Sequence, residues 1–239
     1  MYSSIQASFR DRSPARNTQL FWAVAAAVIV HVAGLIGIIW GDPVWFSSKT
    51  PLNLMLMFVL LLLNQSRRDI SFYFFIALGF ATGMVTEMIG VQTGMLFGDY
   101  AYGTVLGPGW KGVPFLIGVN WFVTVFISMG LAAAALDRFV SHRLDVLNKQ
   151  WGRFLLLPLL GAAVATGFDW IMEPVAVALG FWTWAGDGAI PLFNYFCWFT
   201  ISWLLLTAGM LLRIDFRNPF SIPLLFIQSL FFLLLRFSF

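Results

Sequence analysis

Residues 114–136 read PFLIGVNWFVTVFISMGLAAAAL, and this stretch decides the fold class. It contains no charged side chain, and about 20 residues of α-helix span a bilayer core about 30 Å thick. Similar hydrophobic stretches lie near Leu20–Trp40, Pro51–Leu63, Ile70–Gly90, Phe154–Phe181, Ile190–Leu212 and Pro219–Leu235. The sequence therefore predicts an all-α, polytopic membrane helix bundle of about seven transmembrane helices, with residues 1–239 forming a single integral membrane domain.

The composition excludes several classes of protein. Sixty per cent of the 239 residues are hydrophobic and only 10% are charged, which excludes a water-soluble globule. The one cysteine excludes an intrachain disulfide and a Cys-rich metal site, and two histidines cannot build a histidine-rich di-iron cluster. All three lysines fall in predicted loops, which excludes a retinal Schiff base, and the net charge of +3 does not indicate a nucleic-acid partner. We therefore expect neither a cofactor nor a metal.

Basic residues give the orientation of the bundle. Of the 14 lysines and arginines, 11 fall in one set of alternating loops, and the other set holds only Lys49, Lys111 and Arg236. Cytoplasmic loops carry the excess of positive charge in membrane proteins. We therefore predict that the N-terminus lies in the cytoplasm and the C-terminus outside.

The outer loop over residues 91–113 differs from the short loops elsewhere. It contains six glycines together with Phe97, Tyr100, Tyr102 and Trp110. Long loops in compact domains are often functional, and glycines let the backbone turn sharply and approach a ligand. A flexible connector is one interpretation, but the aromatic content favours a folded lid that dips into the outer leaflet.

Three carboxyl groups fall within or at the edge of predicted spans: Glu87, Asp169 and Glu173. An ionisable group at membrane depth is costly and is by default a functional candidate. Glu87 lies about 26 Å along its helix from Ile70, and Asp169 lies about 24 Å from Arg153. Both helices run outward, so the two carboxyls should share a layer about 5 Å below the outer surface. Glu173 follows one turn beyond Asp169 on the same helix face.

Two amides, Asn120 and Asn194, reach the same layer from the outer ends of the fourth and sixth spans. We therefore predict that Glu87, Asp169, Asn120 and Asn194 surround one cavity beneath the glycine-rich loop. These residues could instead be hydrogen-bonded packing residues or groups wetted by the interface. The equal depth of Glu87 and Asp169 on separate helices argues against that interpretation for this pair.

Proline and glycine in the spans predict local geometry. Pro174 should free the backbone carbonyl of Trp170, because proline has no N–H to donate. Small residues let transmembrane helices approach closely. We expect this at Gly79, Gly83, Gly161 and Gly167.

Several segments resemble the CruF-type carotenoid-biosynthesis hydratases of bacteria and archaea. The resemblance is carried by Thr86–Gly90, Phe97–Tyr102, Leu106–Pro108, Gly112–Pro114, Asp169, Glu173–Pro174, Gly180–Trp184 and Pro191–Tyr195. It implies a cofactor-independent carotenoid 1,2-hydratase in a prokaryotic cytoplasmic membrane. Its partners would be membrane lipid and an acyclic carotenoid such as lycopene, γ-carotene or a C50 bisanhydrobacterioruberin-like polyene.

The residues agree with that chemistry. Hydration of a trisubstituted alkene needs a proton donor, a pocket that tolerates a tertiary cation, and a positioned water. A carboxylic acid in an apolar layer can stay protonated at neutral pH. We expect Glu87 or Asp169 to be the acid and the other to be the base or the electrostatic stabiliser, with Glu173 as a third catalytic candidate.

The expected substrate-binding residues are Asp99, Tyr100, Tyr102, Asn120, Trp170 and Asn194. Aromatic faces stabilise a cation, and amides bind water. Two alternatives remain open. A lycopene-type cyclase begins with the same protonation but captures the cation internally, and a non-enzymatic carotenoid or lipid carrier does not need paired carboxyls.

Overall fold

The computed structural model describes residues 14–140 and 150–238. The long helices are α2 (Pro14–Trp40), α4 (Thr50–Asn64), α5 (Ile70–Thr93), α6 (Phe115–Ala135), α8 (Gln150–Ala178), α9 (Leu192–Leu211) and α10 (Ser221–Arg236). A short helix α3 (Pro43–Ser47) precedes α4, and a π-helical turn η1 (Leu136–Val140) follows α6. The predicted all-α bundle is confirmed, although several helices extend beyond their apolar stretches into polar flanking residues.

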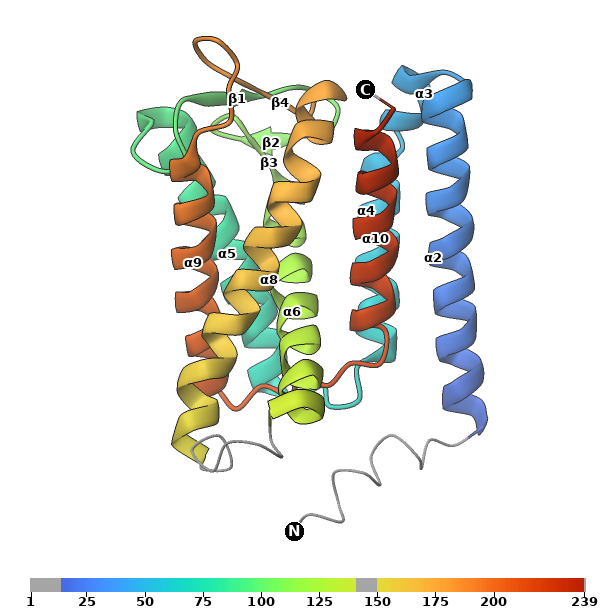
Figure 1. The fold of residues 1–239 in the computed structure, drawn as a ribbon, viewed down its shortest axis with the longest axis vertical. Coiled ribbons are helices and arrows are strands. Elements are labelled where there is room, and N and C mark those ends of the chain that lie inside the picture. Colours follow the sequence, from blue (N-terminus) through green and yellow to red (C-terminus); the bar gives the residue numbers. More distant parts are fainter. Residues whose placement is uncertain (1–13, 141–149, 239) are drawn as a thin grey trace.

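Six helices of the described chain are long and apolar enough to cross a membrane, with α3 and α4 taken together as one. The seventh, α10, is apolar but has only 16 residues. The described ends of the chain, at the start of α2 and the end of α10, lie at opposite ends of the bundle (Figure 1). This placement agrees with an odd number of crossings, as the sequence predicts.

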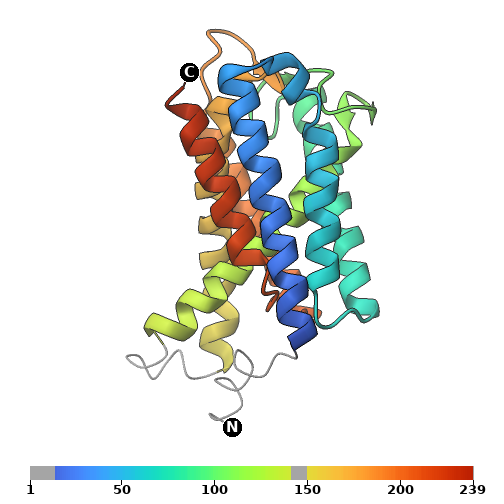
Figure 2. The ribbon, with the colours of Figure 1, turned by 90° about the vertical axis from the view of Figure 1, so that its right-hand side faces the viewer.

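Helix α6, which contains most of the stretch quoted at the outset, is the central helix of the bundle. It contacts α4, α5, α8, α9 and α10 (Figures 1 and 2). Of its 21 residues, 14 are buried. Helices with apolar side chains on all sides are typical of buried positions. The most uniformly hydrophobic stretch therefore forms the core, and α2 and α10 pack side by side at one edge (Figure 2).

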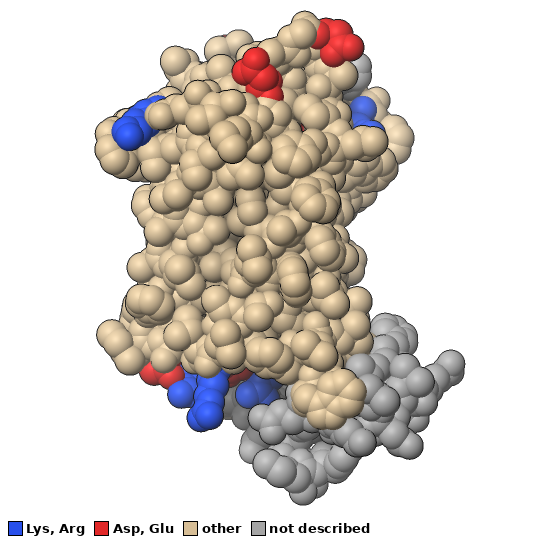
Figure 3. Space-filling model, turned by 90° about the vertical axis from the view of Figure 1, so that its left-hand side faces the viewer, with Lys and Arg blue, Asp and Glu red and all other residues tan. Residues whose placement is uncertain are grey.

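Charged side chains lie at the two ends of the molecule. Figure 3 shows a wide band without Lys, Arg, Asp or Glu on the face in view, and blue basic groups gather below it. This band has the character of a surface that faces lipid tails.

Three of the four glycines expected to allow close helix packing do so: Gly79, Gly83 and Gly161. A Cβ atom at Gly83 on α5 would lie 2.6 Å from Cγ of Trp121 on α6. The expectation was wrong for Gly167, because a Cβ atom there would meet nothing within 4 Å. Gly167 faces open space rather than a neighbouring helix, which spacing along the sequence does not reveal.

The outer end of the bundle carries two small antiparallel sheets. β1 (Tyr100–Tyr102) pairs with β4 (Trp182–Trp184), with Tyr100 opposite Trp184, and β2 (Gly109–Trp110) pairs with β3 (Val113–Pro114). The loop over residues 91–113 is therefore folded: α5 continues to Thr93, and β1 joins the segment after α8. The all-α prediction contains no strands, because segments of two or three residues give no recognisable alternation.

Candidate active site

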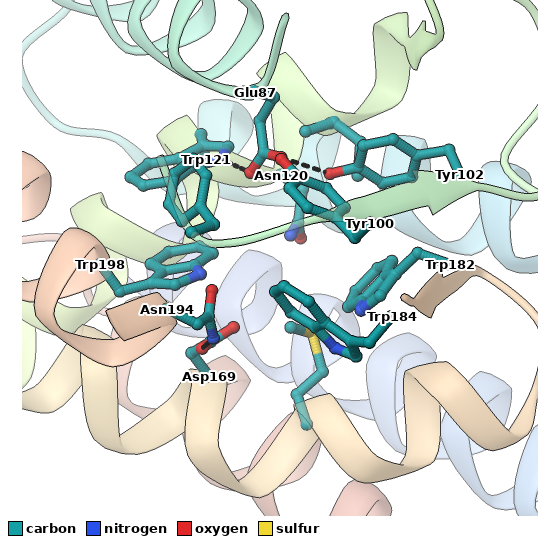
Figure 4. Close-up of a pocket in the computed structure, with 13 residues that line it drawn as sticks. Glu87, Tyr100, Tyr102, Asn120, Trp121, Asp169, Trp182, Trp184, Asn194 and Trp198 are labelled. Atoms are coloured by element: carbon teal, nitrogen blue, oxygen red, sulfur yellow. Dashed lines mark hydrogen bonds between the residues drawn. The ribbon is translucent and has the colours of Figure 1, made fainter. Parts of the chain in front are cut away.

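A buried cavity lies between the outer halves of α5, α6, α8 and α9 (Figure 4), and side chains of β1 and β4 complete its wall. It is lined by Glu87, Phe97, Tyr100, Tyr102, Ile117, Asn120, Trp121, Asp169, Met172, Trp182, Trp184, Asn194 and Trp198. About 30 Å³ is open to the centre of a water molecule. A single water needs about 10–15 Å³ by this measure, so the cavity has room for about two.

The predicted common lining of Glu87, Asp169, Asn120 and Asn194 is confirmed. Glu87 and Asp169 lie at one depth because the outward runs that lead to them have nearly equal length. Their chemical roles stay predictions.

Glu87 on α5 is 5% exposed and accepts hydrogen bonds on both carboxylate oxygens. The Tyr102 hydroxyl donates to Oε2 at 2.7 Å, and the Tyr100 hydroxyl donates to the same oxygen. The indole Nε1–H of Trp121 donates to Oε1 at 2.8 Å. This carboxyl is therefore held by three donors from two other elements.

The two phenols stay protonated. Burial raises the pKa of Tyr100 and Tyr102 well above the usual value, and the adjacent Glu87 charge raises both further. Since a neutral phenol is a donor, Tyr100 and Tyr102 remain hydrogen-bond donors to Glu87 at any pH that a cell experiences.

Asp169 on α8 has different surroundings. It is 1% exposed, and its Oδ2 accepts a hydrogen bond from Nδ2 of Asn194 at 3.0 Å. Its other oxygen, Oδ1, has no hydrogen-bond partner among the residues that the structure describes. Asp169 therefore brings to the cavity a buried oxygen that has no partner in the described part of the chain.

Glu173 is not part of the cavity lining. It is 2% exposed, and its Oε1 accepts from Nε1 of Trp182 at 2.6 Å and Nε1 of Trp184 at 2.7 Å. Glu173 thus lies behind two indoles that themselves line the cavity. Its place in the structure is a hydrogen-bonded support for β4.

Aromatic rings form most of the remaining wall. Trp121 and Trp198 are stacked with ring centroids 4.0 Å apart and planes 3° from parallel, and the Tyr100 ring lies 5.0 Å from that of Trp184. The predicted site residues did not include the four tryptophans of the cavity wall, Trp121, Trp182, Trp184 and Trp198. The spacing of Trp198 four residues after Asn194 was a usable signal, because such residues share a helix face.

Two expected substrate-binding residues lie outside the cavity. Trp170 is 53% exposed, because its side chain points about 100° around α8 from that of Asp169. Asp99 is exposed because residues next to each other in an extended strand face opposite sides, and Tyr100 faces inward. Neither residue lines the cavity with the two carboxyls.

The carbonyl of Trp170 does take an unusual partner, as Pro174 predicts. Nη1 of Arg236 donates to it at 3.3 Å, and the Arg236 guanidinium lies 4.7 Å from the centre of the Trp170 ring. This contact joins the end of α10 to α8 on the outer surface of the bundle.

No group of three or more His, Cys, Asp and Glu side chains within residues 14–140 and 150–238 is placed to hold a metal ion. The polar groups that the cavity offers are carboxyls, phenols, amides and indoles. Such a set can transfer protons, stabilise positive charge and bind water.

A family model described as carotenoid biosynthesis protein matches residues 48–235, which include every residue that lines the cavity. The chain is also 31% identical over 134 residues to the bisanhydrobacterioruberin hydratase of Haloarcula japonica. That alignment covers 54% of this chain and 40% of the relative. No solved structure matches the chain. The chain belongs to the carotenoid biosynthesis protein family.

Proposed function

We propose that this protein is a carotenoid 1,2-hydratase, which adds water across the terminal double bond of an acyclic ψ end group. The observation that carries the proposal is the pair of buried carboxyls, Glu87 and Asp169, that face one aromatic cavity from separate helices. The name of the Haloarcula relative supports the same reaction class.

The reaction needs three things from the protein. A proton is transferred to C2 of the terminal alkene, the resulting tertiary cation at C1 is stabilised, and the oxygen of a water molecule bonds to C1 and loses a proton. Positioned carboxyls transfer protons, and preorganised charges stabilise a developing cation. Glu87 and Asp169 would share these roles, and no electron transfer is involved.

The cavity walls suit a carbocation. Indole and phenol faces carry negative potential and attract positive charge. The rings of Tyr100, Trp182, Trp184 and Trp198 would supply these faces in place of Trp170, which lies outside. Asn120 and Asn194 would bind the water.

A carotenoid dissolved in the membrane would bring its end group laterally into the outer half of the bundle. A terminal isoprene unit is larger than the two waters for which the cavity has room, so side chains must move when it enters. The loop over residues 91–113 contributes Phe97, Tyr100 and Tyr102 to the wall, and we propose that it acts as the lid. The setting would be the inner membrane of a prokaryote.

Expression in a lycopene-producing host, with the mass of the extracted pigment as the measurement, tests the proposal. A hydratase adds the mass of one water for each modified end. A pigment of unchanged mass but altered retention indicates a cyclase, and an unchanged pigment indicates a carrier. Either of these results would refute the hydratase reaction for lycopene, and γ-carotene and a C50 polyene would then be supplied in turn.

A further inference from the structure

The two carboxyls of the cavity differ in how many hydrogen bonds they accept. Glu87 accepts three, which occupy both of its oxygens, and Asp169 accepts one. An indole N–H can only donate, so Oε1 of Glu87 must be an acceptor in its contact with Trp121. The protein thus surrounds Glu87 as it would surround an ion.

Several donors on one carboxylate stabilise its ionised form. Two carboxyls in one cavity do not both ionise readily, because like charges repel in a medium of low polarity. Among the described residues, Glu87 has three donors and Asp169 has one. The proton of the pair therefore belongs on Asp169.

The hydrogen bonds also indicate which oxygen of Asp169 carries the proton. Asn194 donates to Oδ2 of Asp169, while Oδ1 has no partner among the described residues although the side chain is buried (Figure 4). A buried acceptor without a donor costs free energy, whereas a protonated Oδ1 can donate to whatever fills the cavity. Asn194 is in this sense a positioning residue.

We propose, on the basis of the hydratase function proposed above, that Asp169 carries out both proton transfers and that Glu87 stays ionised throughout the cycle. The O–H of Asp169 protonates C2, and the π electrons of the alkene form the new C–H bond and leave a cation at C1. Water then forms the C–O bond at C1, and the proton that it loses returns to Asp169. One water is consumed, and the protein ends in its starting state.

Infrared spectroscopy of the full-length protein in lipid tests this assignment without any need for turnover. A neutral carboxylic acid has a C=O stretching band that is separate from the amide band and shifts in D2O. The wild-type protein should show this band, Asp169→Asn should lose it, and Glu87→Gln and Glu173→Gln should keep it. Asp169→Glu, which preserves the acid, should shift the band rather than remove it, and this variant replaces Asp169→Asn should that variant fail to fold.

Three results would overturn the assignment: no such band in the wild-type protein, its persistence in Asp169→Asn, or its loss in Glu87→Gln or Glu173→Gln. The hydratase function fails separately. A wild-type protein with the Asp169 band that leaves every supplied carotenoid unhydrated refutes the reaction but not the protonated state. Hydrated pigment together with a band that belongs to Glu87 refutes only the assignment.

Discussion

Asp169 and Trp170 are consecutive residues of α8 with opposite surroundings. Asp169 is buried against Asn194 beside the cavity, while Trp170 lies on the outer surface against Arg236. One step along a helix turns the side chain by about 100°. Under the proposed function, the chemistry at this position would therefore depend on the Asp169 carboxyl and not on the Trp170 ring.

At the scale of single residues, we expect Glu87→Gln and Asp169→Asn each to lower hydration by at least about 100-fold, because each removes a charge or a transferable proton. Both proteins should fold, since glutamine is easier to bury than the Glu87 carboxylate and asparagine exchanges the neutral Asp169 acid for another neutral polar group. The measurement is hydroxylated carotenoid per amount of folded protein. The control is Asp187→Asn in an exposed loop, where the asparagine side chain can still accept from the amide of Ala189. Near-normal activity in both cavity variants would contradict the assignment.

Glu173 gives a second test at this scale. Glu173→Leu should leave two buried indole donors unpaired, at a cost of about 1–3 kcal/mol for each. Glu173→Gln keeps an acceptor for Trp182 and Trp184 and should retain most of the stability and activity. Unfolding in detergent, followed by tryptophan fluorescence, measures the first effect. A folded Glu173→Gln protein without activity would instead make Glu173 a catalytic group, as the sequence allowed.

At the scale of elements, the contact between α5 and α6 depends on Gly83. An alanine there would place its Cβ 2.6 Å from Cγ of Trp121, so the helices must separate or the indole must turn. We expect Gly83→Ala to lower the free energy of unfolding by about 1–3 kcal/mol, as overpacking does. Activity should fall as well, because Trp121 donates to Glu87. The control is Gly167→Ala on α8, where the added Cβ faces open space, and this variant should be at least as stable as the wild type. Equal thermal unfolding of the two variants would refute the packing argument.

The pairing of β1 with β4 allows the lid to be tested directly. Ala101 and Thr183 are opposite each other in the register, and both are exposed, so their side chains point away from the cavity. We expect the lid to open when substrate enters. A disulfide in the double variant Ala101→Cys/Thr183→Cys should therefore abolish most of the activity, and a reductant should restore the activity. The same variant in reduced form is the matched control. Full activity in the cross-linked protein would mean that the substrate enters between helices without movement of this sheet.

At the scale of the whole molecule, the charge asymmetry predicts the orientation of the bundle. Arg68, between α4 and α5, and Asp187, between β4 and α9, are exposed at opposite ends. A membrane-impermeant thiol reagent should label Asp187→Cys in intact cells and Arg68→Cys only after the membrane is broken. The native Cys197 is buried and should react with neither treatment. The reverse labelling pattern would show that the bundle has the opposite orientation in the membrane.

The sequence by itself determined the helix bundle and the layer in which the carboxyls lie, and it predicts the number of crossings and their orientation. Hydrophobic length and the rise per residue are local quantities, so a stretch such as residues 114–136 shows them without its neighbours. Basic residues are likewise counted along the chain, loop by loop. The same rise per residue brought Glu87 and Asp169 to one cavity together with Asn120 and Asn194. The rise per residue could not exclude Trp170 from the predicted cavity, because depth along a helix does not determine which way a side chain faces.

Only the tertiary structure decided how the carboxyls differ. The donors to Glu87 come from β1 and α6, 13 to 34 residues away in the chain. The donors to Glu173 come from β4, 9 to 11 residues away. Strands of three residues carry no periodic signal. Helices α6 and α8 separate β1 from β4 in the chain, so the pairing of these strands depends on the packed bundle. Hydrogen bonds form over distances near 3 Å between elements that the fold brings together. A local pattern therefore places an acid in a layer, but only the folded chain determines which acid is surrounded by donors and which has an oxygen without a donor among residues 14–140 and 150–238.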